Sequence, residues 1–97
     1  MTSFIHTKDM TTTRREFFRC LHIALDNIPH TIDGNNIKVD NNGKVITLDI
    51  SPLPPRELSK TLVMERWHLT IEFVNHDDSE RTIFLKKFDR AFHRGGG

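Results

Sequence analysis

The sequence is short of several residue types on which common functional sites depend. It has a single cysteine, Cys20, among 97 residues, so an intramolecular disulfide and a cysteine-based zinc site within one chain are excluded. A reducing compartment fits this composition. No apolar run approaches the ~18 residues of a membrane span, and no basic segment followed by an apolar stretch marks a secretory signal. We therefore expect a cytoplasmic protein that does not enter a membrane.

An excess of one charge is also missing. Lys and Arg total 14 against 13 Asp and Glu, so no global field draws the chain toward nucleic acid or a membrane surface. The six histidines are scattered and form no HExxH motif. Cys20 and His22 lie two positions apart on a predicted helix and so point in nearly opposite directions. The acidic run at 76–80 lacks the spacing of a calcium loop. We expect no metal site and no cofactor.

What the sequence does contain is the pattern of one small α+β domain. With 97 residues, 36 % hydrophobic and 28 % charged, the chain has the composition of a globular protein and the length of a single domain. The 67–73 segment alternates apolar and polar residues without a break, which predicts a half-buried central strand. Thr13 and Glu16 match a capping box, and the apolar spacing that follows predicts an amphipathic helix over 13–28, ended by Pro29.

Turn signals at Asp33-Gly34 and at 41–43 separate further apolar alternations. They predict a hairpin of 36–40 with 44–51. The run at 51–55 contains three prolines and is expected to form an extended crossover outside the sheet. The apolar parity changes from even positions before 65 to odd positions after it, which predicts a bulge near Glu65-Arg66. A polar loop at 75–80 is expected to lead into a strand over 81–88.

The predicted fold is therefore one N-terminal helix packed on an antiparallel meander of about four strands, closed by a short C-terminal helical segment around Phe88, Ala91 and Phe92. The domain should cover 13–94, after a flexible arm at 1–12 and before a frayed glycine tail at 95–97. If ordered, Phe4 and Ile5 would add a short edge strand. The predicted core consists of Phe17, Leu21, Ala24, Leu25, Ile28, Ile37, Val39, Ile46, Leu48, Ile50, Trp67, Leu69, Ile71, Phe73, Ile83 and Leu85.

The leading functional hypothesis is a non-enzymatic interaction or regulatory protein that uses a sheet face or an edge strand. Val45, Phe84 and Met64 are expected on the side of the sheet away from the helix, where exposed apolar residues favour a protein partner or a homo-oligomer such as a dimer. The C-terminal segment folding over them is an equally consistent alternative. The candidate binding face comprises Arg66, His68, Thr70, Glu72 and Phe84.

A nucleic-acid-binding module is the alternative hypothesis. Interleaved phenylalanines near the C-terminus could stack on bases, and positive charge is concentrated at the first helix and the C-terminus. The candidate basic patch comprises Arg14, Arg15, Arg19, Lys86, Lys87, Arg90 and Arg94.

Two further hypotheses have less support in the residues. Acid–base chemistry by His68 would need a concave site, and no nucleophile with an activating base is evident, so we assign no catalytic residue and lean against an enzyme. The tail from Arg94 to Gly97 resembles the tails of ubiquitin-like modifiers and sulfur-carrier proteins, whose terminal glycine is activated as an adenylate. The resemblance is limited to those four residues, and those families place a hairpin before their main helix.

Overall fold

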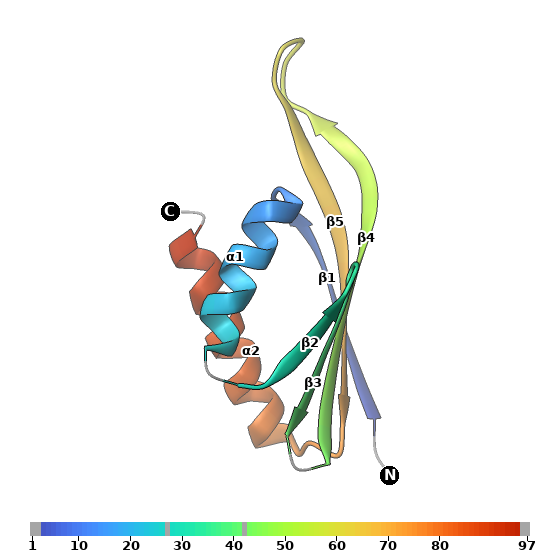
Figure 1. Ribbon diagram of the computed structural model, residues 1–97. Coiled ribbons are helices and arrows are strands. Elements are labelled where there is room, and N and C mark those ends of the chain that lie inside the picture. The colour runs from blue at the N-terminus through green and yellow to red at the C-terminus, as the bar shows by residue number, and fades with distance from the viewer. Residues whose placement is uncertain (1–2, 27, 42, 96–97) are drawn as a thin grey trace.

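A computed structural model describes residues 3–26, 28–41 and 43–95. Within these residues the chain forms a five-stranded antiparallel sheet with two helices on one of its faces (Figure 1), which confirms the α+β fold class. The elements in chain order are β1 (Ser3–Thr11), α1 (Arg14–Leu25), β2 (His30–Asp33), β3 (Asn36–Asn41), β4 (Lys44–Glu57), β5 (Val63–Val74) and α2 (Asp78–Gly95).

The strands are ordered β1-β5-β4-β3-β2 across the sheet. The predicted hairpin is confirmed, because Ile37 pairs with Leu48 and Val39 with Ile46. The alternating segment at 67–73 lies in β5, between β1 and β4, and so occupies the inner position expected of it. Its odd-numbered residues face the helices, and Leu69, Ile71 and Phe73 are each at most 1 % exposed.

The N-terminal segment is a strand and not the flexible arm that the sequence suggested. β1 pairs with β5 from Ser3↔Val74 to Thr11↔Arg66. The edge strand expected in case Phe4 and Ile5 are ordered is therefore present, and it is 9 residues long. Met10 reaches the core and is 8 % exposed. No apolar period is visible in β1, because the positions that share its helix-facing side include the polar residues His6 and Lys8. Residues 1 and 2 of the expected arm lie outside the described residues.

The first helix begins where its cap predicts. Thr13 accepts a hydrogen bond from the Glu16 backbone N–H at 3.0 Å, while the Glu16 carboxylate binds Arg19. The helix ends at Leu25, earlier than the predicted 28, because Asp26 adopts a positive φ of 48° and its N–H closes the last turn onto the His22 carbonyl.

The predicted strand over 81–88 is wrong, since these residues belong to α2. A reciprocal capping box starts this helix: Asp77 Oδ1 accepts from the Glu80 N–H at 2.8 Å, and Glu80 Oε1 accepts from the Asp77 N–H at 3.0 Å. The expected loop at 75–80 therefore contains a helix start. As a consequence, Ile83, predicted in the core, is 64 % exposed, whereas Phe84 and Phe88 are buried.

The proline-rich run is also part of the sheet and not a crossover. β4 continues to Glu57, and its residues beyond Ile50 have β5 as their only strand neighbour, since the β3 pairing ends at Asp49. Prolines are tolerated at such an edge because no second strand needs their missing N–H. The predicted bulge exists at the expected level, but on the partner strand: pairing jumps from Leu53↔Arg66 to Arg56↔Met64, so Pro54 and Pro55 together oppose Glu65.

Residues 54–65 form a two-stranded ribbon that extends past the helices and the rest of the sheet, which we call the β4–β5 arm (Figure 1). Its end is closed by hydrogen bonds between Ser59 and Leu62. Leu58, Leu62 and Val63 near this end are 51 %, 50 % and 57 % exposed. The arm therefore contributes little to the core.

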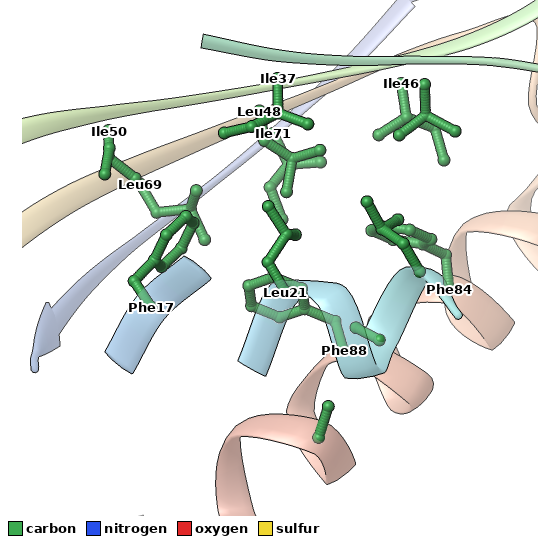
Figure 2. Close-up of a cluster of buried hydrophobic side chains, with 14 of the residues drawn as sticks. Phe17, Leu21, Ile37, Ile46, Leu48, Ile50, Leu69, Ile71, Phe84 and Phe88 are labelled. Atoms are coloured by element: carbon green, nitrogen blue, oxygen red, sulfur yellow. The ribbon is translucent and has the colours of Figure 1, made fainter. Parts of the chain in front are cut away.

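The core lies between the sheet and the helix pair. Figure 2 shows Phe17 and Leu21 of α1 and Phe84 and Phe88 of α2 facing the sheet residues Ile37, Ile46, Leu48, Ile50, Leu69 and Ile71. The helices run antiparallel, with Phe17 near the start of α1 5.4 Å from Phe92 near the end of α2, measured between ring centroids. Of the predicted core, Ile28, Trp67 and Leu85 are only partly buried, and the buried residues Met10, Cys20, Phe84, Phe88 and Ala91 extend it.

Candidate functional site

The predicted binding face is the sheet surface away from the helices, which we call the open face. Arg66, His68, Thr70 and Glu72 project there from β5, as alternation along the strand requires. Asp9 of β1 joins two of them: its Oδ1 lies 2.7 Å from His68 Nδ1, and its Oδ2 lies 3.8 Å from Arg66 Nη2. The neighbouring strands add Thr7, Lys38, Thr47, Asp49 and Ser51 to this face. It is a mostly polar surface.

The fifth predicted member of this face, Phe84, does not lie there. It belongs to α2 and packs edge-to-face on Phe73, with ring centroids 5.6 Å apart, under the helix layer. Of the other apolar residues expected on the open face, Val45 is half-buried there beside Val74, and Met64 belongs to the arm. α2 covers the same face of the sheet as α1 (Figure 1), so the alternative in which the C-terminus covers the open face is wrong.

His68 lies on the open face with its side chain 40 % exposed. It is not among the residues that line four hollows of the described chain, which lie beside the helices or beside β2 and β3. Acid–base chemistry by His68 stays a hypothesis that gains no support from these hollows.

The basic clusters of α1 and α2 are brought into one layer, though not as one uniform patch. Lys87 and Arg90 line a hollow of about 180 Å³ with Ile23 of α1. Arg19 is bound to Glu16, and that contact lowers the pKa of the Glu16 carboxyl. Arg14 is directed at the β2–β3 turn. Arg15 and Lys86 are exposed on the helix surfaces, while the side chain of Arg94 lies outside the described residues.

Cys20 lines a second hollow, of about 240 Å³, between β1 and the two helices. The thiol is 1 % exposed, and its Sγ lies 3.9 Å from Glu16 Oε1. Burial, followed by the neighbouring Glu16 charge, raises the pKa of the Cys20 thiol. Because the thiolate is the reactive form, Cys20 has the character of a packing residue.

A third hollow, which the sequence did not predict, lies between α1 and the edge strand β2. It has a volume of about 600 Å³ and is lined by Arg14, Arg15, Phe18, His22 and Ile32; we call it the α1–β2 groove. Phe18 is half-buried against the core, and Ile32 is 43 % exposed. The groove is thus apolar in its centre and lined at its margin by two guanidinium groups and an imidazole.

One side of this groove is the free edge of the sheet. β2 is the last strand and pairs only with β3. Gly34, with φ of +61°, is the first central residue of a two-residue turn that joins Asp33 to Asn36. In such a hairpin the pair that closes the turn, here Asp33 and Asn36, is hydrogen-bonded, and non-hydrogen-bonded and hydrogen-bonded pairs then alternate along the two strands. The backbone N–H and C=O groups of Ile32 and His30 therefore point away from β3. These groups form a short row of unused donors and acceptors beside the groove.

Arg14 fixes the spacing between the helix and this strand. Its Nη2 donates to the Gly34 carbonyl at 3.0 Å, and its Nε donates to Asn35 Oδ1 at 2.8 Å. The same guanidinium lies 4.6 Å from the centre of the Phe18 ring. The β2–β3 turn is also held from the sheet side, because the Ile50 N–H donates to the Asn35 carbonyl at 3.0 Å. The groove is therefore preformed.

The sequence contained a partial signal for the groove. Phe18 belongs to the predicted helical stripe, but next to Phe17 it could be taken for an ordinary core residue. The strand beside it has only four residues, with Ile32 as the sole aliphatic side chain, which is too short for a visible alternation.

Among the described residues, no group of three or more His, Cys, Asp or Glu side chains is placed to hold a metal ion. No helix in the described part of the chain has the length and apolar character to cross a membrane. Comparisons of the chain with protein-family models, with curated proteins and with solved structures found no match.

Proposed function

We propose that this protein is a small non-enzymatic interaction protein that binds a partner protein through the free edge of β2. The observation that carries the proposal is the coincidence of an unpaired strand edge and a preformed apolar hollow at the α1–β2 groove. Adding a strand to such an edge supplies backbone hydrogen bonds, and an adjacent hollow accepts alternate side chains of the added strand. The single cysteine supports a reducing, cytoplasmic setting for this role.

The other edges of the sheet are less suited to this role. On β1, Lys8 faces the helix side and forms an ion pair with Asp89 of α2 at 3.3 Å. The free half of β4 contains Pro52, Pro54 and Pro55, which cannot donate to an added strand. Inward charges and prolines are devices by which proteins protect sheet edges from association. The edge of β2, by contrast, exposes Ile32 beside a hollow.

A matched pair of edge substitutions tests the proposal. Ile32→Ser removes the exposed apolar side chain on β2, and Ile5→Ser removes one of similar exposure, 58 % against 43 %, on β1. Proteins that co-purify with the chain from cells are quantified by mass spectrometry, and direct binding of the purified partner is then measured. We expect Ile32→Ser to weaken binding by about tenfold or more, while Ile5→Ser leaves it unchanged.

A partner that binds both variants equally well would contradict the proposal, as would the absence of any partner that depends on Ile32. A second copy of the chain can also act as the partner. In that case sedimentation would depend on protein concentration for the unmodified chain and for Ile5→Ser, but not for Ile32→Ser.

A nucleic-acid-binding role is a second candidate, favoured by the approach of the two basic clusters. Lys87 and Arg90 of α2 lie beside α1 at Ile23, and Arg15 and Arg19 lie two turns and one turn before Ile23 on α1. The base-stacking part of this hypothesis is not supported, since Phe84 and Phe88 are buried. The remaining contacts would be to phosphates, whose contribution weakens steeply with salt.

Titration of single-stranded RNA and DNA at low and moderate salt tests this second candidate. The double charge reversal Lys87→Glu with Arg90→Glu should abolish binding, whereas Lys38→Glu on the open face should not. Absence of binding at low salt would exclude the nucleic-acid role.

A further inference from the structure

We infer that the α1–β2 groove recognises an extended acidic segment, with carboxylates two residues before and after an apolar side chain, that adds to the sheet beside β2. This inference rests on the proposed edge function and specifies the chemistry of the partner. Three properties of the groove support it: the character of its floor, the charge at its margin and the geometry of its edge.

The apolar part of the groove can contact an aliphatic side chain. Phe18 and Ile32 are its apolar residues, and the exposed 43 % of Ile32 is the surface that a partner would cover. In an added strand alternate side chains point to the same face, so only every second residue of the partner enters the groove. The residues between them project toward the open face, where Thr31 and Asp33 of β2 lie.

The margin of the groove carries the guanidinium groups of Arg14 and Arg15 and the imidazole of His22, with no carboxylate among the described lining residues. Glu16, the acidic residue nearest to them in sequence, is bound to Arg19. Asp33 at the end of β2 shares a sheet face with Asn36 and so belongs to the open face. Carboxylates two residues before and after the apolar residue share its face of the strand and would therefore meet Arg15 and His22, whereas a basic segment would be repelled by the arginines.

The geometry of the edge limits the length of the segment. β2 has four residues, which at about 3.3 Å per residue allow only a short paired stretch. Outward-pointing backbone groups occur at alternate residues of an edge strand, here His30 and Ile32. Because Arg14 already holds α1 and the β2–β3 turn together, the partner binds without first opening the groove.

Synthetic peptides test the inference directly. The probe is a capped, fluorescently labelled heptapeptide, Thr-Glu-Thr-Val-Thr-Glu-Thr, in which Glu, Val and Glu occupy every second position and so share the face that meets the groove. One comparison peptide replaces every Glu by Lys, and another carries N-methyl groups on alternate backbone nitrogens. Binding to the full chain is measured by fluorescence anisotropy at moderate salt. We expect the acidic peptide to bind about tenfold or more tightly than either comparison peptide, because only it offers both the charges and the backbone donors.

Charge reversal on the protein provides the matched control. Arg15→Glu should weaken binding of the acidic peptide and strengthen binding of the Lys peptide. Lys60→Glu, the same reversal at the exposed end of the arm, should change neither. Ile32→Pro, which removes an outward N–H but no bond to β3, should weaken binding of every peptide, and circular dichroism confirms that this variant folds. Ile32→Ser serves as the second variant if it does not.

The outcomes separate the inference from the function on which it rests. If the Lys peptide binds as tightly as the acidic peptide or more tightly, and the Ile32 variants still bind peptides more weakly, the preference for an acidic segment is overturned. The proposed binding at the edge of β2 is then retained. Binding of the acidic peptide that ignores Arg15→Glu would overturn the inference as well. Failure of all peptides to bind, together with a cellular partner that ignores Ile32→Ser, would overturn both proposals.

Discussion

Ile83 and Phe84 are adjacent residues in opposite environments, and they show how side-chain position decides stability in this chain. Ile83 is 64 % exposed and Phe84 9 % exposed. Along α2 the buried or half-buried residues Phe84, Leu85, Phe88, Ala91 and Phe92 have the same spacing as Phe17, Phe18, Leu21, Ala24 and Leu25 along α1. The two helices therefore present matching apolar stripes to the sheet and to each other.

Truncation of one residue on each side of α2 tests this arrangement. Phe88 is 1 % exposed and contacts Phe84 and Phe92. Phe88→Ala should lower the free energy of unfolding by about 3–5 kcal/mol, since it removes a large buried side chain and leaves a cavity. Ile83→Ala should change it by no more than about 0.5 kcal/mol, because that side chain is mostly in water. Urea denaturation followed by circular dichroism measures both.

A comparable loss in the two variants would mean that Ile83 also packs in the core, as a strand over 81–88 would require. The sequence holds enough information to prefer the helix, since the apolar positions at 84–92 have the same spacing as those at 17–25. A strand is also compatible with this segment because the residues around Ile83 and Leu85 alternate, and a short apolar run fits both periods.

The ion pair between Lys44 and Glu80 joins the start of β4 to the first turn of α2. The hydrogen bond from Lys44 lowers the pKa of the Glu80 carboxyl below its usual 4.5, and the Asp77 N–H lowers it further. A carboxyl whose pKa is depressed on folding contributes stability that is present above its unfolded pKa. This stability is lost as the pH falls through the lower folded pKa.

We therefore predict that Glu80→Gln destabilises the protein at neutral pH, and that the difference from the unmodified chain shrinks as the pH falls below 4.5. Lys44→Gln should show the same trend, and the double variant should be little worse than either single one, because the two side chains act together. Thermal unfolding across this pH range measures the effect. A difference that does not vary with pH would contradict the assigned ion pair.

At the scale of elements, the β4–β5 arm is the part of the sheet with the least support. Between residues 54 and 65 each described strand of the arm has only the other as a strand neighbour, and isolated two-stranded ribbons are marginal in water. Three exposed apolar residues near its end, Leu58, Leu62 and Val63, add no contact with the described core.

Hydrogen exchange should therefore divide β4 and β5 into two parts. Amides of the arm should exchange through local opening, whereas those of β4 and β5 in the body, such as Leu48 and Ile71, should exchange at rates set by global unfolding. Mass spectrometry of peptic fragments measures this difference. Equal protection along the whole of β5 would show that the arm is held by contacts absent from the present account.

Several features of single strands could not be predicted from the sequence because each depends on the strand beside it. β1 shows no apolar alternation, yet its backbone pairs with β5 along its whole length. The prolines of β4 indicated a break, but they are tolerated where no strand lies on the second side. The parity change predicts a bulge or a short break near Glu65-Arg66, whereas the extra residue lies in β4, between Leu53 and Arg56. A single strand's sequence cannot show which partner carries the insertion.

For the whole molecule, local patterns predicted the α+β class, the first helix, the central hairpin and most of the core. Each depends on periodicity or turn chemistry that is complete within a short stretch. The α1–β2 groove could not be predicted in this way. It depends on the approach of α1 to a strand of four residues and on Arg14 reaching the turn at Gly34 and Asn35, and both are consequences of the tertiary fold.

Residue-resolved amide exchange by NMR shows most directly whether the edge of β2 accepts an added strand. In the free protein the amides of His30 and Ile32 should exchange rapidly, while those of Thr31 and Asp33, which face β3, should be protected. On addition of the acidic peptide, protection of His30 and Ile32 should rise by about tenfold or more at saturation. Unchanged exchange at these two amides, with peptide-induced shifts located on the open face or the helix layer, would contradict the proposed strand addition.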